Sequence, residues 1–415
     1  MKIASRFAVL MFMSAILATA TASARAMPAM PIPAKAGGHG YAQTNLVSNG
    51  AVPAAFTDAN LINPWGISFI PGLSPFWVSD NNAGVTTLYD GAGSPFPSPA
   101  TPLVVDIPLP TDPTKGGNGG APTGQVANLT ILTATPAFLI PNTAVPDTNF
   151  GPALFIFATE DGTIEAWNET VPEPDGTPTP NLGLPDDAVI VVDNSAGGGP
   201  TGAVYKGLAL ATRTVASTPG VPFLYATNFR TGNIDVFDGT FTQVTVPGTF
   251  TDPKVQHGYA PFGIQAINNQ IWVTYALQDA AKHDPVNKPA HGFVSVFDTD
   301  GNLISHFAQH GHLSSPWGVA LAPASFGKFA NDILIGNFGD GRINAYNPTN
   351  RHWLGMLTDG KGKAIVNPGL WSVTFSGAMG STAVNANPDT LYITAGLLGP
   401  THENAGLFAT IAPNP

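Results

Sequence analysis

NPWGISFIPG, from Asn63 to Gly72, returns later in the chain as SPWGVALAPA, Ser315 to Ala324, and in weaker form as APFGIQAINN, Ala260 to Asn269. Each copy places a proline, an aromatic residue and a glycine ahead of a run in which apolar residues alternate. A catalytic motif usually occurs once, so the repetition indicates a repeated structural unit. Alternation with a period of two is typical of β-strands, and it dominates the chain after the N-terminal segment.

Aligning the repeated segments divides the chain into six units of three or four short strands. The third strand of most units ends in an aromatic residue followed by Asp or Asn, as in TLYDG, EAWNE and DVFDG. Such an Asx side chain can bond the backbone two residues on and start a turn. The innermost strands are predicted at Trp65–Ile70, Val126–Leu132, Tyr205–Ala211, Phe262–Ile267, Trp317–Ala322 and Leu370–Phe375.

The sixth unit has no fourth strand before the C-terminus, whereas YAQTNLVS, Tyr41 to Ser48, precedes the first unit and belongs to none. We expect this N-terminal segment to become the outer strand of unit six. Four antiparallel strands cannot bury both of their faces alone, and packing the units around a ring solves that problem. The sequence therefore predicts one all-β domain over residues 41–415, a six-bladed β-propeller with four-stranded antiparallel blades, closed by an N-terminal strand.

The first 26 residues have the pattern of a secretory signal peptide, with two early cations, an apolar core and a small-residue cleavage site. Residues 27–40 are rich in Pro, Ala and Gly, and we expect a flexible leader there. The protein is thus expected to be secreted or periplasmic. No later run is apolar enough to span a bilayer, so no transmembrane segment is expected after signal removal.

The composition excludes several classes of function. A formal net charge of −11 argues against binding nucleic acid through a basic patch. The absence of cysteine rules out disulfides, thiolate metal sites and a cysteine nucleophile.

The Pro-aromatic-Gly segments have a structural explanation. Proline suits the residue just before a strand, and glycine lets the backbones pass closely where the blades converge. The aromatic residue between them either packs against the next blade or lines the mouth of the channel, and the sequence leaves both open.

Several segments, including LINPWGISF, ATEDGTIEAWN, GYAPFGIQ, SPWGVALAPASFGKF and LIGNFGDGRINAYN, resemble a family of secreted bacterial proteins of unassigned function. The resemblance runs from about Tyr41 to Pro413 and implies an NHL-like six-bladed propeller. Some members end in an exopolysaccharide-associated sorting tail, which the C-terminal IAPNP does not match. The family implies no established catalytic residues.

In a propeller, the loops before each first strand and those between second and third strands open on one face. The polar residues on these loops are Asp80, Asn81, Asn82, Glu160, Asp161, Asn228, Arg230, Gln278, Asp279, His283, Asp284, Asn337, Asp340, His402, Glu403 and Asn404, and beside them stand aromatic residues and Lys206. Tight hairpins need Asn and Asp in any case, which accounts for part of this set. The candidate ligand contacts that we select are Trp65, Asp80, Glu160, Asp161, Asn228, Phe262, Asp279, Trp317, Asn337, Asp340 and Trp371.

Two classes of function fit these residues. The first is a binding or scaffold module for a polysaccharide, a peptide or a small molecule at the channel mouth. The second is a metal-dependent hydrolase similar to gluconolactonase-type six-bladed propellers, with Ca²⁺ or another divalent cation on Glu160, Asn228, Asp279 and Asn337.

Binding is the preferred hypothesis because no histidine and carboxylate have a spacing in the sequence that indicates a general base and its partner. His283 precedes Asp284 directly, as His402 precedes Glu403. In an extended segment, neighbouring side chains point to opposite faces, so neither pair is expected to act together.

Overall fold

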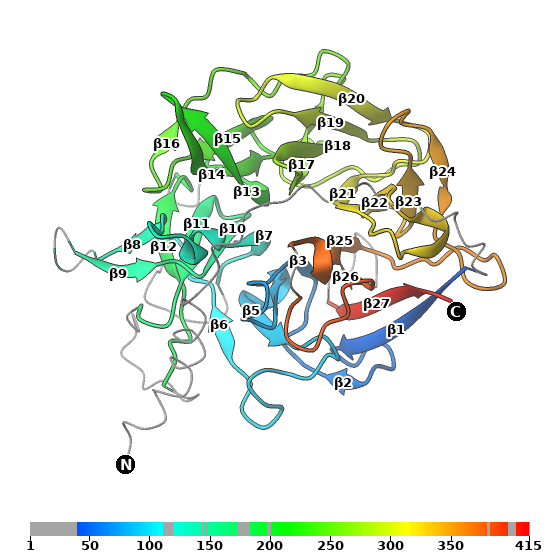
Figure 1. Ribbon diagram of the computed structural model, residues 1–415, viewed down its shortest axis with the longest axis horizontal. Coiled ribbons are helices and arrows are strands. Elements are labelled where there is room, and N and C mark those ends of the chain that lie inside the picture. The colour runs from blue at the N-terminus through cyan, green and yellow to red at the C-terminus, as the bar shows by residue number, and fades with distance from the viewer. Residues whose placement is uncertain are drawn as a thin grey trace, which may run out of the picture. The chain divides into compact units, whose positions relative to one another are not determined.

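The computed structural model describes residues 40–110, 119–142, 145, 148–171, 183–196, 201–379, 382–396 and 404–414. The predicted signal peptide, and the predicted leader except for its last residue, lie outside the described residues, as do His402 and Glu403. Within residues 40–414 the sheets surround a common axis, and the predicted all-β six-bladed propeller is confirmed (Figure 1).

Each blade runs outward from its innermost strand in antiparallel order. Blade 1 contains β3 Pro64–Ser68, β4 Phe76–Asp80, β5 Val85–Tyr89 and β6 Val104–Asp106. Blade 2 contains β7 Pro122–Ala127, β10 Phe155–Thr159, β11 Thr163–Trp167 and β12 Val189–Asp193. Blade 3 contains β13 Tyr205–Val215, β14 Thr218–Asn228, β15 Asn233–Phe237 and β16 Gln243–Val244.

The second half of the ring follows the same order. Blade 4 contains β17 Tyr259–Ile267, β18 Gln270–Leu277, β19 Phe293–Phe297 and β20 Leu303–Gln309. Blade 5 contains β21 Pro316–Leu321, β22 Ile333–Asn337, β23 Ile343–Tyr346 and β24 Trp353–Met356. Blade 6 contains β25 Leu370–Phe375, β26 Leu391–Ala395, β27 Leu407–Pro413, β1 Tyr41–Ser48 and the short parallel β2 Phe56–Thr57.

The remaining described elements are small. Strands β8 Leu139–Pro141 and β9 Asn149–Pro152 form a hairpin that projects beside blade 2 (Figure 1). The 3₁₀-helices are η1 Asn81–Ala83, η2 Leu129–Leu132, η3 Gly327–Phe329 and η4 Ser376–Met379. None of the described helices is long and apolar enough to cross a membrane.

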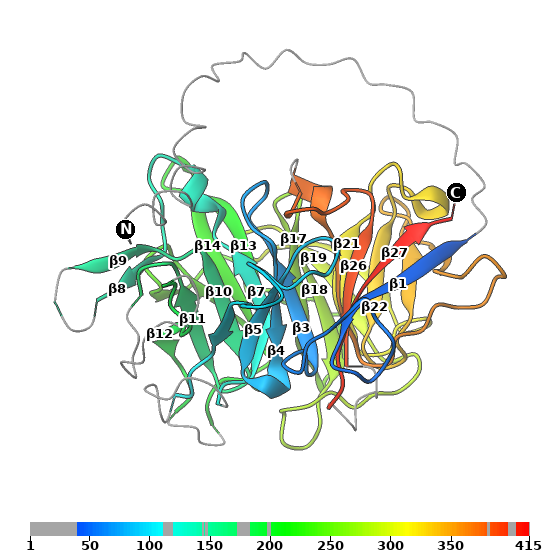
Figure 2. The ribbon, with the colours of Figure 1, turned by 90° about the horizontal axis from the view of Figure 1, so that it is seen from below.

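Strand β1 closes the ring, as predicted. It pairs antiparallel with β27, from Tyr41 opposite Pro413 to Ser48 opposite Leu407, and the two strands lie side by side in both views (Figures 1 and 2). The last blade is therefore built from both ends of the described chain. No cysteine is needed to hold these ends together, because a ladder of backbone hydrogen bonds does so.

The predicted innermost strand of blade 2 is wrong. We expected Val126–Leu132, but β7 begins at Pro122, and Leu129–Leu132 form η2. The Asn128 side chain accepts a hydrogen bond from the Thr130 backbone N–H and caps this helix. The error arose because Pro122-Thr123-Gly124 is the blade 2 form of the repeated motif, with threonine where four of the other five blades have an aromatic residue.

The hydrophobic core lies between the facing sheets of neighbouring blades. The Trp77 ring in blade 1 stacks on Phe155 in blade 2, with ring centroids 4.1 Å apart. On the other side of blade 1, Phe76 packs against Tyr392 of blade 6 at 4.4 Å. Large aromatic side chains thus bury the faces that a single sheet would leave open.

Close contact between innermost strands requires glycine. A Cβ atom added to Gly263 would lie 2.1 Å from the Trp317 carbonyl oxygen of the next blade. A Cβ added to Gly318 would lie 2.5 Å from the Trp371 carbonyl oxygen, and one added to Gly124 would lie 2.3 Å from the Leu208 nitrogen. Side chains any larger would push the blades apart.

We expect Gly263→Ala to lower the free energy of unfolding by about 3 kcal/mol or more, because the new methyl group would overlap backbone atoms that cannot move aside. The control is Gly362→Ala, where φ is +81° and no atom lies within 4 Å of the added Cβ. That variant should lose only about 1 to 2 kcal/mol, from backbone strain. Chemical denaturation measures both, and equal losses would contradict the steric explanation.

Candidate functional site

In every blade, one residue of the innermost strand stands directly before the repeated glycine, or before Ser372 in blade 6. In blades 1 to 6 these residues are Trp65, Thr123, Lys206, Phe262, Trp317 and Trp371. The four aromatic ones form a single cluster with Phe229 and Phe338. Trp65 and Trp371 stack with centroids 3.4 Å apart, and Trp317 meets both rings edge-on.

These four aromatic candidates are buried, with exposed fractions of 8% or less. They pack against one another, which is the packing alternative of the two left open by the sequence. A cavity of about 30 Å³ lies beside their strands, lined by residues that include Gly66, Gly124 and Gly318. Their predicted role as ligand contacts has no support from this placement, since their faces are covered.

Blade 3 departs from the pattern by placing a lysine in this aromatic cluster. The Lys206 side chain is fully buried, and its Nζ lies 5.3 Å from the Trp65 ring centroid. Nζ forms an ion pair with Glu160 of blade 2 and lies 3.4 Å from Asp284 Oδ1 in the loop of blade 4. A buried ammonium group needs such partners, because an isolated charge is too costly to remove from water.

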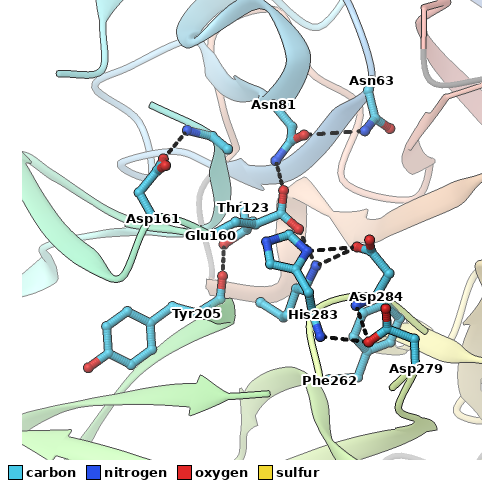
Figure 3. Close-up of polar contacts among 12 residues, drawn as sticks. Asn63, Asn81, Thr123, Glu160, Asp161, Tyr205, Phe262, Asp279, His283 and Asp284 are labelled. Atoms are coloured by element: carbon cyan, nitrogen blue, oxygen red, sulfur yellow. Dashed lines mark hydrogen bonds and ion pairs between the residues drawn. The ribbon is translucent and has the colours of Figure 1, made fainter. Parts of the chain in front are cut away.

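Glu160 is held from two sides. Its Oε1 contacts Lys206, and its Oε2 accepts a hydrogen bond from Asn81 Nδ2 at 3.0 Å. The side-chain oxygen Oδ1 of Asn81 in turn accepts from Asn63 Nδ2 (Figure 3). The Oδ1 of Asn63 accepts from the Trp371 indole N–H at 2.8 Å. A chain of polar contacts thus runs from blade 6 through blades 1, 2 and 3 to blade 4.

The loop between β18 and β19 brings His283 and Asp284 together. Their side chains meet at 3.1 Å, between His283 Nδ1 and Asp284 Oδ1 (Figure 3). The sequence-based expectation that adjacent side chains would diverge is therefore wrong. The segment is a tight turn rather than a strand, with Lys282 at a φ of 54° and Asp279 Oδ1 accepting the His283 backbone N–H at 2.8 Å.

This contact shifts the pKa of both groups. The hydrogen bond to Asp284 raises the pKa of His283 above its usual value. The hydrogen bond from His283, helped by the nearby Lys206 charge, lowers the pKa of Asp284 to about 2. The Asp284 carboxylate therefore stays ionised at neutral pH.

A cavity of about 410 Å³ opens beside these groups. Its lining residues are Asn81, Asn82, Ala83, Gly84, Gly119, Gly120, Ala121, Glu160, His283 and Asp284. Carboxylate, amide, imidazole and backbone groups dominate this lining, and it contains no aromatic ring other than the imidazole. It offers many hydrogen-bond partners in a small volume.

Most of the other candidates hold their own loops in place. Asp161 accepts the Ala121 backbone N–H at 2.7 Å, and burial raises its pKa. Asp80 accepts from Thr87 at 2.7 Å, and its complete burial raises its pKa well above the usual value. These carboxyl groups are positioned by neighbours within one or two blades.

The asparagine candidates also bond locally. Asn228 Nδ2 donates to Asp235 at 3.0 Å, and Asn337 Nδ2 donates to Asp340 at 3.0 Å. The metal set predicted from the sequence, Glu160 with Asn228, Asp279 and Asn337, stays a prediction. The carboxylates and imidazole that the described structure brings within 4.8 Å of one another are a different set, Glu160 with His283 and Asp284.

Lys206, Asn63, Asn81, His283 and Asp284 were not selected as site residues from the sequence. A signal existed for three of them, Lys206, His283 and Asp284. Lys206 occupies the aromatic position of the repeated motif, and a lysine there must find a carboxylate partner. Asp279 stands at the start of a turn, where an Asx side chain bends the chain and changes which side chains meet.

No protein-family model matches this sequence. Two proteins of Acanthamoeba polyphaga mimivirus, both described only as uncharacterized, are each 28% identical to it. One match spans 330 residues, 78% of this chain and 71% of the relative, and the other spans 347 residues, 78% and 76%. Because both relatives are uncharacterized viral proteins, they do not test the expected bacterial source or the expected export of this chain, and both stay predictions.

Among solved structures, the soluble aldose sugar dehydrogenase of Escherichia coli is similar over 90% of this chain and 100% of its own, with a TM-score of 0.44 and 11% identity. A gluconolactonase of Xanthomonas campestris is similar over 62% of this chain and 82% of its own, with a TM-score of 0.34 and 15% identity. At these values neither similarity bears on the activity of this chain.

The buried ion pair gives a test of stability. Lys206→Met should lower the free energy of unfolding by about 3 to 5 kcal/mol, because Glu160, only 13% exposed, would keep a charge without its cation. Adding Glu160→Gln should restore part of the loss. The control is Arg342→Met, which removes the exposed Arg342–Asp340 pair and should cost about 1 kcal/mol or less. Urea denaturation compares the variants, and a Lys206→Met loss no larger than the control would refute this role.

The His283–Asp284 contact should make stability depend on pH. Because the His283 pKa is raised, its contribution is complete below about 6.5, the unfolded value, and is lost as pH rises through the folded pKa. Because the Asp284 pKa is lowered, its contribution is present above about 4 and is lost as pH falls toward 2. The pair should stabilise the fold most between about pH 4 and 6.5.

Measuring unfolding free energies of the wild type and His283→Gln across pH checks this. The difference between the two proteins should be largest near pH 5 and should shrink by pH 9. A difference independent of pH would show that His283 is not in contact with Asp284 in solution.

Proposed function

We propose that the propeller binds a small, neutral, hydroxyl-rich ligand, such as a monosaccharide unit, in the cavity beside Glu160 and Asp284. The observation that carries the proposal is the polar lining of a cavity of about 410 Å³, which loops of blades 1, 2 and 4 form. Ligand sites are concave, and a few fixed polar groups determine which ligand fits.

The fixed groups suit hydroxyl ligands. Asp284 is 66% exposed and remains ionised, so its carboxylate can accept hydrogen bonds from ligand hydroxyls. The amides of Asn81 and Asn82 and the backbone of Gly119 and Gly120 line the same cavity. Lys206 beneath the floor neutralises part of the carboxylate charge, so a ligand need not be cationic.

The second candidate function is a divalent-cation site, as in the metal-dependent hydrolase hypothesis. The grouping of Glu160, His283 and Asp284 ligand atoms within 4.8 Å favours it. The position of Lys206 argues against it, because an ammonium group already contacts both carboxylates and repels a second cation. We therefore prefer a neutral ligand to a divalent cation. We also propose that the protein is exported from the cytoplasm, as its N-terminal sequence pattern predicts.

Isothermal titration calorimetry against a panel of neutral sugars tests the proposal. At least one sugar should bind the wild type, and Ala83→Phe should weaken that binding at least tenfold, because the ring would fill part of the cavity that Ala83 lines. The matched control is Ala42→Phe on the exposed face of β1, which should bind as the wild type does.

Two results would contradict the proposal. One is a panel in which no sugar binds, and the other is equal binding by Ala83→Phe. Thermal melting with chelator and then with Ca²⁺ or Mg²⁺ distinguishes the second candidate, since a rise in melting temperature with metal concentration would favour the cation site.

A further inference from the structure

We propose that the His283–Asp284 pair gives this cavity a catalytic activity, the hydrolysis of an ester or lactone without a metal ion. The inference rests on the proposed function, because the ester must first bind where the hydroxyl-rich ligand binds. It goes beyond binding by assigning one imidazole as a general base.

The geometry of His283 carries the inference. The side chain lines the cavity, and its Nδ1 is occupied by Asp284 Oδ1 at 3.1 Å. Among the described residues, no hydrogen bond occupies Nε2. When Nδ1 donates its proton to a carboxylate, the neutral imidazole carries its lone pair on Nε2, which is the arrangement of a general base oriented by an acidic residue.

Asp284 acts as the positioning residue for this base. Its Oδ1 contacts both His283 Nδ1 and Lys206 Nζ, and Asp279 Oδ1 accepts the backbone N–H of His283 and of Asp284, at 2.8 and 3.3 Å. The loop and the carboxylate are thus fixed from two directions. Such fixing keeps the imidazole in one orientation and selects one tautomer.

Glu160 is not available as an alternative base. Its Oε1 is paired with Lys206, and its Oε2 accepts from Asn81. Glycoside hydrolysis requires two carboxyl groups, one of which donates a proton to the leaving oxygen. Because Glu160 is paired with a buried ammonium, ester hydrolysis fits this site better than cleavage of a glycosidic bond.

The reaction balances with water as the only co-reactant. A water oxygen forms a bond to the ester carbonyl carbon while one water proton moves to His283 Nε2. The carbonyl re-forms as the bond to the leaving alkoxide breaks, and the imidazolium returns the proton to that alkoxide. The products are a carboxylic acid and an alcohol, and His283 is again neutral.

Hydrolysis of p-nitrophenyl acetate by the full chain, in the presence of EDTA, tests the inference. We expect His283→Gln to lower kcat/KM about 100-fold or more, which is the usual contribution of a general base. The control His352→Gln removes an exposed imidazole just before β24 and should leave the rate unchanged. Thermal melting should confirm that His283→Gln remains folded.

Asp284→Asn distinguishes positioning from a merely structural role. Asp284 and Glu160 raise the pKa of His283, whereas Lys206 lowers it. Removing the Asp284 charge should therefore shift the rising limb of the pH–rate profile to lower pH while lowering kcat. An unshifted profile would remove Asp284 from this role.

The outcomes separate this inference from the proposed function. Sugar binding without any hydrolysis, hydrolysis that EDTA abolishes, or hydrolysis unchanged in His283→Gln would each overturn the inference and leave binding intact. Hydrolysis that depends on His283 without binding of any sugar in the panel would support the base and overturn the proposed ligand class.

Discussion

The six innermost strands can share one axis only where neighbouring backbones come nearly into contact. The glycines at positions 66, 124, 207, 263 and 318 each face the innermost strand of the next blade, and a Cβ there would meet its atoms at 2.1 to 3.1 Å. Blade 6 has Ser372 instead, and its junction with blade 1 is held by a hydrogen bond from Thr394 to the Trp65 carbonyl at 2.6 Å. Thr227 and Thr274 make the corresponding bonds at two other junctions. The same small residue therefore recurs because one geometry recurs.

Because the glycine alone allows the close contact between neighbouring innermost strands, the residue before it can differ from blade to blade. The candidate site arises from that difference. Four blades use this position for an aromatic ring, whereas blade 2 has Thr123 and blade 3 has Lys206. The lysine cannot be buried alone, so it draws the Glu160 and Asp284 carboxylates toward the axis from two neighbouring loops. The cavity lies on this side of the ring, beside the residues that Lys206 gathers. The lysine at a position that is aromatic in four other blades thus determines where the polar groups of the site come together.

The sequence predicted the fold well because strand periodicity and Asx turns are local properties. Strands Leu370–Phe375 and Tyr41–Ser48 match their predicted bounds. The innermost strand of blade 2 was misplaced because Thr123 stands where four of the other five blades have an aromatic residue. The site was predicted less well. Glu160 was selected, but its contact with Lys206 depends on how the loops of neighbouring blades are arranged around the ring. The contact between His283 and Asp284 depends on the turn that begins at Asp279. Neither is encoded in spacing alone.

The pairing of β1 with β27 has a consequence for how the molecule is made. The sixth sheet joins β1 to β27, which is more than 300 residues later in the chain, so the ring cannot be completed during synthesis until β27 has emerged from the ribosome. Until then, β1 and β26 each present an unpaired edge, of the kind that attracts other chains. Loops of such long sequence separation also slow the final step of folding. The pairing that closes the ring therefore makes folding of the sixth blade depend on β27, which is made long after β1.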